Sequence, residues 1–171
     1  MSVEVSYDTK DVKKLQKLLR IASSVDPDPP LKRMGVYMIS ETDRTFREGG
    51  RGSVKWSALS DATFSIREST KGKRGELRPL MGEGHLRRAF NTKIFGPKKE
   101  RNLKIFTPTP YAKFHQEGAR IRIFGRGKLR SLPKRPMLFF TKKDRDRAAQ
   151  EFKDHANNVM RDAVHKSGLR K

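Results

Sequence analysis

Histidine side chains are the groups of this sequence best suited to acid–base or metal chemistry, and they are few. The chain has four histidines, His85, His115, His155 and His165, and no cysteine. On one helix, a spacing of ten residues separates His155 from His165 by about 80° around the axis and about 15 Å along it. These two histidines therefore cannot share a metal ion, and no recognised metal-ligand motif occurs elsewhere.

His115 is the candidate for a general base, because Glu117 lies close to it in the sequence. General acid–base chemistry needs a second positioned group, and no further carboxylate stands nearby in the sequence. The glycine-containing stretch 125–129 lacks the first glycine and the Ser or Thr of a phosphate-binding loop. We therefore predict no enzyme, no catalytic residue, no cofactor and no metal site. A phosphodiester-cleaving enzyme that uses His115 is the third-ranked alternative.

Positive charge is the dominant property of the sequence. Its 171 residues include 40 Lys and Arg against 19 Asp and Glu, a formal net charge of +21. Residues 49–140 carry 22 basic and 6 acidic residues, whereas residues 1–48 carry 9 and 8. Because such an excess repels itself, we expect the middle of the chain to face DNA or an acidic protein. The basic residues predicted for this surface are Lys71, Lys73, Arg74, Lys98, Lys99, Arg101, Arg120, Arg122, Arg126, Lys128 and Arg130.

Known nucleic-acid-binding motifs are absent from this basic region. Aromatic residues are interleaved with the basic ones, but no RNA-recognition strand, helix-turn-helix, zinc finger or basic zipper occurs. What remains is sequence-independent attraction to phosphates. A sequence-independent nucleic-acid-binding protein, active in DNA packaging or on the ribosome, is therefore the alternative function.

Membrane insertion and secretion are not expected. No apolar run approaches the roughly 18 residues of a membrane-spanning helix. The first ten residues lack the basic start and apolar stretch of a signal peptide. We expect a soluble intracellular protein with no membrane partner.

Helices are expected at both ends of the chain. Residues 8–22 and 31–48 carry apolar side chains at helical spacing, and a proline-rich break separates them. A Gly-Gly pair ends the second helix. Residues 142–167 form the third helix, for which Thr141 and Asp144 make a pair like a capping box.

The middle of the chain is expected to be extended. Short β-prone runs occur at 89–95, 103–107, 120–124 and 137–140. Residues 49–85 have few apolar side chains and are predicted to be an extended arm or loop anchored by Trp56, Leu59 and Phe64. The fold class is therefore α+β: a small, mainly antiparallel β-sheet packed by N-terminal and C-terminal helices, with long basic loops. A single domain spans 1–171, with N-terminal helices in 1–48, the arm in 49–85, the sheet region in 86–140 and the C-terminal helix in 141–171.

Four short blocks, in this order, resemble the phage virion morphogenesis family, the tail-completion group of tailed bacteriophages that includes Mu-like and P2-like neck proteins. The blocks are Phe46–Gly50 with Trp56–Ser60, then Leu80–Arg87, then Tyr111–Gly118, which is the most distinctive, and finally Leu132–Leu138. Lys134 departs from the family pattern, which usually has a small residue there. Matching motif residues with expected structural roles are Trp56, Gly84, Tyr111, His115, Gly118, Arg135 and Pro136.

Physical reasoning gives these motif residues specific structural tasks. Trp56 is expected to fill the core. Tyr111, Phe114 and His115 are expected to lock a short helix over 111–117 onto the sheet, with the His115 imidazole bonded to a backbone carbonyl. Arg135 is expected to pair with an acidic group of a neighbouring subunit.

The resemblance implies a non-enzymatic structural protein of the virion, located in the tail or neck and assembled in the host cytoplasm. It implies a homo-oligomeric ring, a homohexamer, at the head–tail junction. Its expected partners are neighbouring neck or connector proteins, tail-tube or tail-terminator proteins, and genomic double-stranded DNA in the channel.

Overall fold

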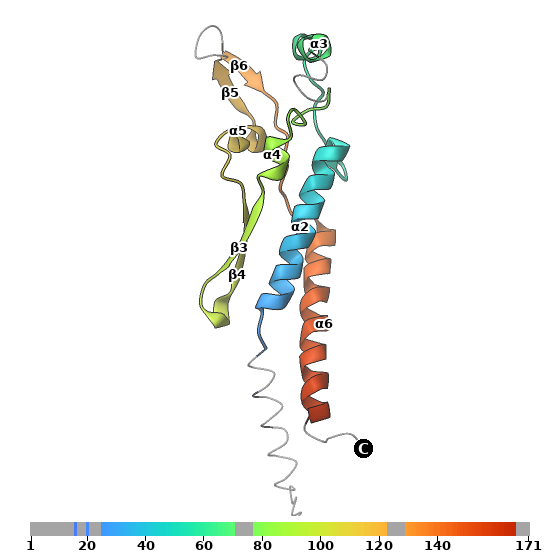
Figure 1. The fold of residues 1–171 in the computed structure, drawn as a ribbon, viewed down its shortest axis with the longest axis vertical. Helices are drawn as coiled ribbons and strands as arrows, with labels where there is room; N and C mark the ends of the chain where they lie inside the picture. The colour runs from blue at the N-terminus through green and yellow to red at the C-terminus, as the bar shows by residue number, and fades with distance from the viewer. Residues whose placement is uncertain (1–15, 17–19, 21–24, 71–76, 123–128, 167–171) are drawn as a thin grey trace, which may run out of the picture.

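Two long helices form the frame of the protein. The computed structural model describes residues 16, 20, 25–70, 77–122 and 129–166. α2 (Asp28–Glu48) and α6 (Lys142–Lys166) pack side by side along the long axis (Figure 1). The helix predicted over 8–22 lies outside the described residues, apart from Gln16 and Arg20, which are helical.

The ends of α2 follow from its proline and glycine residues. Gly49 adopts the left-handed conformation, with φ of 63°, and ends the helix as predicted. The start predicted at residue 31 is too late, because the helix begins at Asp28 and so includes the prolines that were expected to precede it. Pro29 and Pro30 occupy the first turn, where the missing backbone N–H has no helical partner to lose.

The predicted cap of α6 is confirmed. The Thr141 backbone N–H and hydroxyl each donate to the Asp144 carboxylate at 2.7 Å, and the Asp144 N–H donates back to the Thr141 hydroxyl. The apolar stripe of this helix is only partly covered, since Asp144 is its one buried residue among those described. α6 is therefore buried most deeply at its N-terminal end, and Glu151 and His155 attach its middle to Arg33 and to the Asp26 carbonyl.

In the described part of the chain, the β structure consists of three separate two-stranded antiparallel sheets. β1 (Gly50–Arg51) pairs with β2 (Val54–Lys55), β3 (Asn91–Phe95) with β4 (Asn102–Phe106), and β5 (Ala119–Arg122) with β6 (Leu129–Leu132). The α+β class is confirmed, with its strands distributed over hairpins. The strand predicted at 137–140 is wrong, because that segment has no strand, and β6 was not predicted.

The segment 49–85 is more ordered than the predicted arm. It contains α3 (Asp61–Ser69), whose N-cap Ser60 accepts a hydrogen bond from the Thr63 N–H, and it leads into α4 (His85–Arg88). Trp56 is buried as expected, but Phe64 is 41% exposed and is no anchor. The basic residues 71–76 lie outside the described part of the chain.

The β3–β4 hairpin lies along α2 (Figure 1). Gly35 permits this close approach, because a Cβ atom there would lie 3.3 Å from Cγ2 of Thr92. At the hairpin's far end, 3-10 helix η1 (Lys98–Glu100) forms the connection, and Arg101 pairs with Asp28 of α2 at 2.9 Å. One face of the hairpin is therefore fixed to the helical frame.

A small apolar core lies where α2, α4 and α5 (Ala112–Glu117) meet the segment before α6. Its buried members are Phe46, Trp56, Met81, Leu86, Phe90, Ala112 and Met137. The short helix predicted at 111–117 is confirmed, and Gly118 follows it. Among the described helices, none has the length and apolar character needed to cross a bilayer.

Candidate functional site

The motif blocks converge on one region around Trp56. The Trp56 ring meets Phe46 edge-on at 5.3 Å between centroids, and Phe46 meets Phe90 at 6.0 Å. The Trp56 indole Nε1 donates a 2.9 Å hydrogen bond to the Pro136 carbonyl. Blocks 80 residues apart in the sequence are thus joined by one side chain, as its role of core plug predicts.

Gln116 fixes the segment that leads into α6. Its Nε2 donates to the Leu138 carbonyl at 2.7 Å, and its Oε1 accepts from the N–H groups of Met137 and Leu138 at 2.8 and 3.2 Å. One amide thereby satisfies three backbone groups that a strand partner would otherwise satisfy. The predicted strand at 137–140 is replaced by these side-chain hydrogen bonds. Gln116 was not chosen as a site residue, although it stands in the most distinctive motif block.

Arg135 is buried inside its own chain. Its Nε and Nη2 donate to the carbonyls of Ser57 and Ala58 at 3.1 and 2.9 Å. Its backbone N–H donates to the His115 carbonyl at 2.7 Å. These donors bind backbone oxygens of the loop before α3 in the same chain, and the expected ion pair with a neighbouring subunit stays a prediction. Burial, and then the charge of Arg67, lowers the pKa of Arg135 below its usual range.

The surroundings of His115 disfavour the protonated form of its imidazole. Burial lowers its pKa below the ordinary value, and the positive charge of Arg135 lowers it further. Its Nδ1 is buried and has no hydrogen-bond partner among the described residues, so the expected bond to a backbone carbonyl is not formed there. The Tyr111 ring stands edge-on to it at 6.1 Å.

The other two aromatics of this block do not lock the helix in place. Tyr111 and Phe114 are 46% and 49% exposed. Ala112 and Gln116 are the residues of α5 that attach it to the core and to the segment before α6.

The described residues also contain no group of three His, Asp or Glu side chains able to hold a metal ion. The hydrogen bonds of Gln116 and Arg135 hold separate chain segments together.

Glycine conformations complete the motif blocks. Gly84 begins α4 in the left-handed region, with φ of 76°. Gly118 has φ of 78°, and a Cβ atom there would lie 3.2 Å from the Leu132 carbonyl oxygen. Side chains at either position would strain the backbone.

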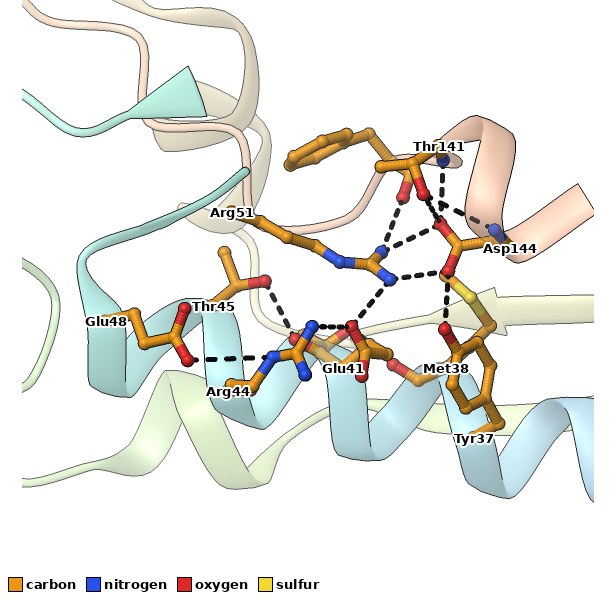
Figure 2. Close-up of polar contacts among 11 residues, drawn as sticks. Tyr37, Met38, Glu41, Arg44, Thr45, Glu48, Arg51, Thr141 and Asp144 are labelled. Atoms are coloured by element: carbon orange, nitrogen blue, oxygen red, sulfur yellow. Dashed lines mark hydrogen bonds and ion pairs between the residues drawn. The ribbon is translucent and has the colours of Figure 1, made fainter. Parts of the chain in front are cut away.

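A buried polar network, which the sequence did not predict, locks α6 to α2 and β1 (Figure 2). Arg51 Nη1 and Nη2 contact the two Asp144 oxygens at 2.9 and 2.5 Å, and Nη2 lies 2.6 Å from Glu41 Oε2. Tyr37 donates its hydroxyl to Asp144 at 3.0 Å. Asp144 is 0% exposed, and Arg51 and Glu41 are also buried.

Charge and hydrogen bonding keep this network ionised. Burial alone would raise the pKa of Asp144, but hydrogen bonds from Arg51, Thr141 and Tyr37 lower it below its ordinary value. Burial alone would lower the pKa of Arg51, but the hydrogen bond and charge of Asp144, with the charges of Glu41 and Tyr37, raise it above its ordinary value. The only sequence signal for this network was the capping pair formed by Thr141 and Asp144.

The predicted basic residues lie on different parts of the surface. Arg120 and Arg122 are exposed on one face of β5, as the alternating pattern predicts. Arg130 is opposite Ile121 in the register, so it lies on the other face, and the described arginines of this hairpin do not form one surface. Lys98 is exposed in η1, Lys99 belongs to the same turn, and Arg101 is paired with Asp28. Lys71, Lys73, Arg74, Arg126 and Lys128 lie outside the described residues.

A cavity of about 700 Å³ lies between α3 and the β5–β6 hairpin. Its lining includes Ile66 of α3, Ile121 of β5, and His115. The motif-block residues His115, Pro133 and Arg135 thus line the space between α3 and the β5–β6 hairpin.

Comparison with known proteins identifies one relationship. The sequence model of the phage virion morphogenesis family matches residues 8–157. This range includes all four motif blocks, the apolar core and the Arg51–Asp144 network. No curated protein and no solved structure gives a match.

Proposed function

The chain belongs to the phage virion morphogenesis family, and on that premise we propose that it is a structural, non-enzymatic protein of the virion that completes the tail. It forms a ring, a homohexamer, at the neck between head and tail, and genomic double-stranded DNA passes through this ring. Its partners in this role are neck or connector proteins on one side and tail-tube or tail-terminator proteins on the other.

The observation that carries this proposal is the use made of the motif residues. Trp56, Gln116 and Arg135 direct their polar atoms to backbone carbonyls and N–H groups of the same chain. In an enzyme active site, polar groups converge on a space where substrate can bind. Here they hold α5, the loop before α3 and the segment before α6 in fixed positions, which is what an assembly scaffold requires.

The distribution of charge supports a channel or an acidic neighbour. Arg120 and Arg122 project from β5 and form no ion pair with any described residue. Six copies would carry a formal charge of +126, six times +21. Such a ring would repel itself unless DNA or acidic proteins offset the charge.

The test is genetic complementation of the phage that encodes this chain. Deletion of the gene is expected to leave filled heads and unjoined tails in electron micrographs, and the wild-type gene is expected to restore joined particles. Immunogold labelling is expected to mark the neck. Joined, infectious particles from the deletion phage, or label on the capsid, would contradict the proposal.

Substitution at the charged strand tests the channel role separately. Arg120→Glu with Arg122→Glu is expected to permit ring assembly and to reduce the yield of infectious particles. Lys142→Glu with Lys143→Glu makes the same charge change at two exposed positions of α6 and serves as the control. The alternative, a nucleic-acid-binding protein, predicts instead a monomer that binds free duplex DNA with a steep salt dependence and is absent from particles.

A further inference from the structure

The outer face of the β3–β4 hairpin combines like charges with exposed aromatic rings. Residues directly opposite each other in the register share a face, and successive pairs alternate between the two faces. Thr92 contacts α2, so the pairs Thr92–Ile105 and Ile94–Leu103 face the helix. The pairs Lys93–Lys104, Asn91–Phe106 and Phe95–Asn102 therefore face away from it.

This outer face is unfavourable in an isolated subunit. Lys93 and Lys104 are exposed and stand directly opposite each other, an arrangement that destabilises an antiparallel pair. Phe95 is 45% exposed, and the Lys104 ammonium lies 5.7 Å from the centre of the Phe106 ring. Neither lysine forms an ion pair with a described residue. An apolar side chain flanked by carboxylates would suit this face.

The outer side of α3 presents that combination. Asp61, Phe64 and Glu68 are spaced i, i+3 and i+7, which places them on one helix face. All three are exposed, and neither carboxylate is paired within the described part of the chain. The opposite side of α3, with Ala62, Thr63 and Ile66, lines the cavity toward β5–β6.

The geometry points to a docking contact between two copies of this chain, in which α3 of one subunit lies on the outer face of the β3–β4 hairpin of the next. Asp61 and Glu68 of α3 meet Lys93 and Lys104, and Phe64 packs between Phe95 and Phe106. The contact offsets the repulsion between the two lysines and covers the exposed rings of Phe64 and Phe95 and the partly buried ring of Phe106. The occupant of each face is thereby a second copy of the same chain.

The two faces lie at different places on the subunit. α3 stands at one end of the molecule, beyond α2, whereas the β3–β4 hairpin flanks the middle and other end of α2 (Figure 1). A contact between two different patches is heterologous, and repetition of such a contact generates a closed ring when its rotation closes. This inference rests on the ring of the proposed function and specifies which elements join its subunits.

Charge reversal provides the test. One variant carries Asp61→Lys and Glu68→Lys, and the other carries Lys93→Glu and Lys104→Glu. Each alone places like charges across every contact, so its self-association is expected to weaken by roughly a hundredfold. An equimolar mixture restores opposite charges at every contact, because the two variants can alternate around a ring with an even number of subunits. Native mass spectrometry is expected to find rings in the mixture, with both variants in equal number.

The control is Lys142→Glu with Lys143→Glu, which changes the net charge as the hairpin variant does and is expected to leave the ring intact. A wild-type ring that tolerates both reversals would overturn the docking contact and leave the proposed function standing. Disrupted variants that do not assemble when mixed would also overturn it, since each face would then meet another partner. A wild-type protein that stays monomeric at every concentration would refute the ring and this contact together.

Discussion

Replacement of Arg51 by leucine tests whether the buried polar network holds the two long helices together. The variant leaves Asp144, which is 0% exposed, without a cation. Removal of one partner from a buried ion pair typically costs about 3–5 kcal/mol of unfolding free energy. We expect a value near the lower end, about 3 kcal/mol, because Thr141 and Tyr37 still donate to Asp144 and Glu41 keeps its contact with Arg44.

Urea unfolding is the direct measurement. Trp56 is the only tryptophan in the chain, and it is buried, so its fluorescence reports loss of the core. For a protein of this size a loss of 3 kcal/mol corresponds to a melting temperature lower by roughly 6–12 °C. Arg44→Leu is the matched control, because Arg44 also contacts Glu41 but is 41% exposed. An exposed ion pair contributes at most about 1 kcal/mol.

The pH dependence of the same two proteins checks the mechanism. In the wild type the pKa of Asp144 is lowered. Its contribution to the free energy of unfolding is therefore complete above about pH 4 and is lost as the pH falls through the pKa that Asp144 has in the folded protein. In Arg51→Leu the largest lowering contact is gone, and burial raises the pKa of Asp144. The variant then gains from protonation, and its stability deficit should narrow as the pH falls from 7 toward about 4. A deficit equal to that of Arg44→Leu, or one independent of pH, would refute the reasoning.

Three further predictions concern the motif cluster. Gln116→Leu removes three hydrogen bonds to backbone groups of Met137 and Leu138. The free energy of unfolding, measured by urea titration, should therefore fall by about 2–3 kcal/mol. A change within experimental error would mean that water replaces the amide. Trp56→Phe keeps an aromatic ring but leaves the Pro136 carbonyl without its donor; a loss of about 1–2 kcal/mol is expected by circular dichroism, and full wild-type stability would contradict a role for that bond. Because the pKa of His115 is lowered, its contribution to the free energy of unfolding is complete above about pH 6.5 and declines as the pH falls below that value. The His115→Gln variant should lack this decline in stability between pH 7 and 5. If the stability of the variant depends on pH as the wild type's does, the decline belongs to another group.

Local signals predicted the long helices well. Thr141 and Asp144 at the start of α6 and Gly49 at the end of α2 are features that act within one turn of chain. The buried face of α2, with Met34, Met38 and Phe46, also follows from residue spacing alone. These elements could be predicted because neighbours in sequence determine them.

The segments that were missed depend on partners far away in the sequence. The stretch 137–140 has a β-prone composition, but the side chain of Gln116 takes the hydrogen bonds that a strand would form. α3 lacks any buried residue, so its apolar pattern was too weak to indicate a helix, although Ser60 is a typical cap. Arg51 stands among glycines and serines and has the local sequence of a solvated loop. Its burial depends on Asp144, which lies 93 positions away.

The ion pairs explain where the excess positive charge remains. Several carboxylates of the two long helices are neutralised by ion pairs within the chain: Asp43 pairs with Arg87, Asp28 with Arg101, and Glu151 with Arg33 and Arg147. Cations without an ion-pair partner among the described residues stand on α6, as Lys142 and Lys143 do, and on the hairpins, where they include Lys93, Lys104, Arg120 and Arg122. Two-stranded ribbons are at best marginally stable by themselves. An anionic partner at the hairpins would therefore both offset the repulsion among their cations and stabilise the ribbons.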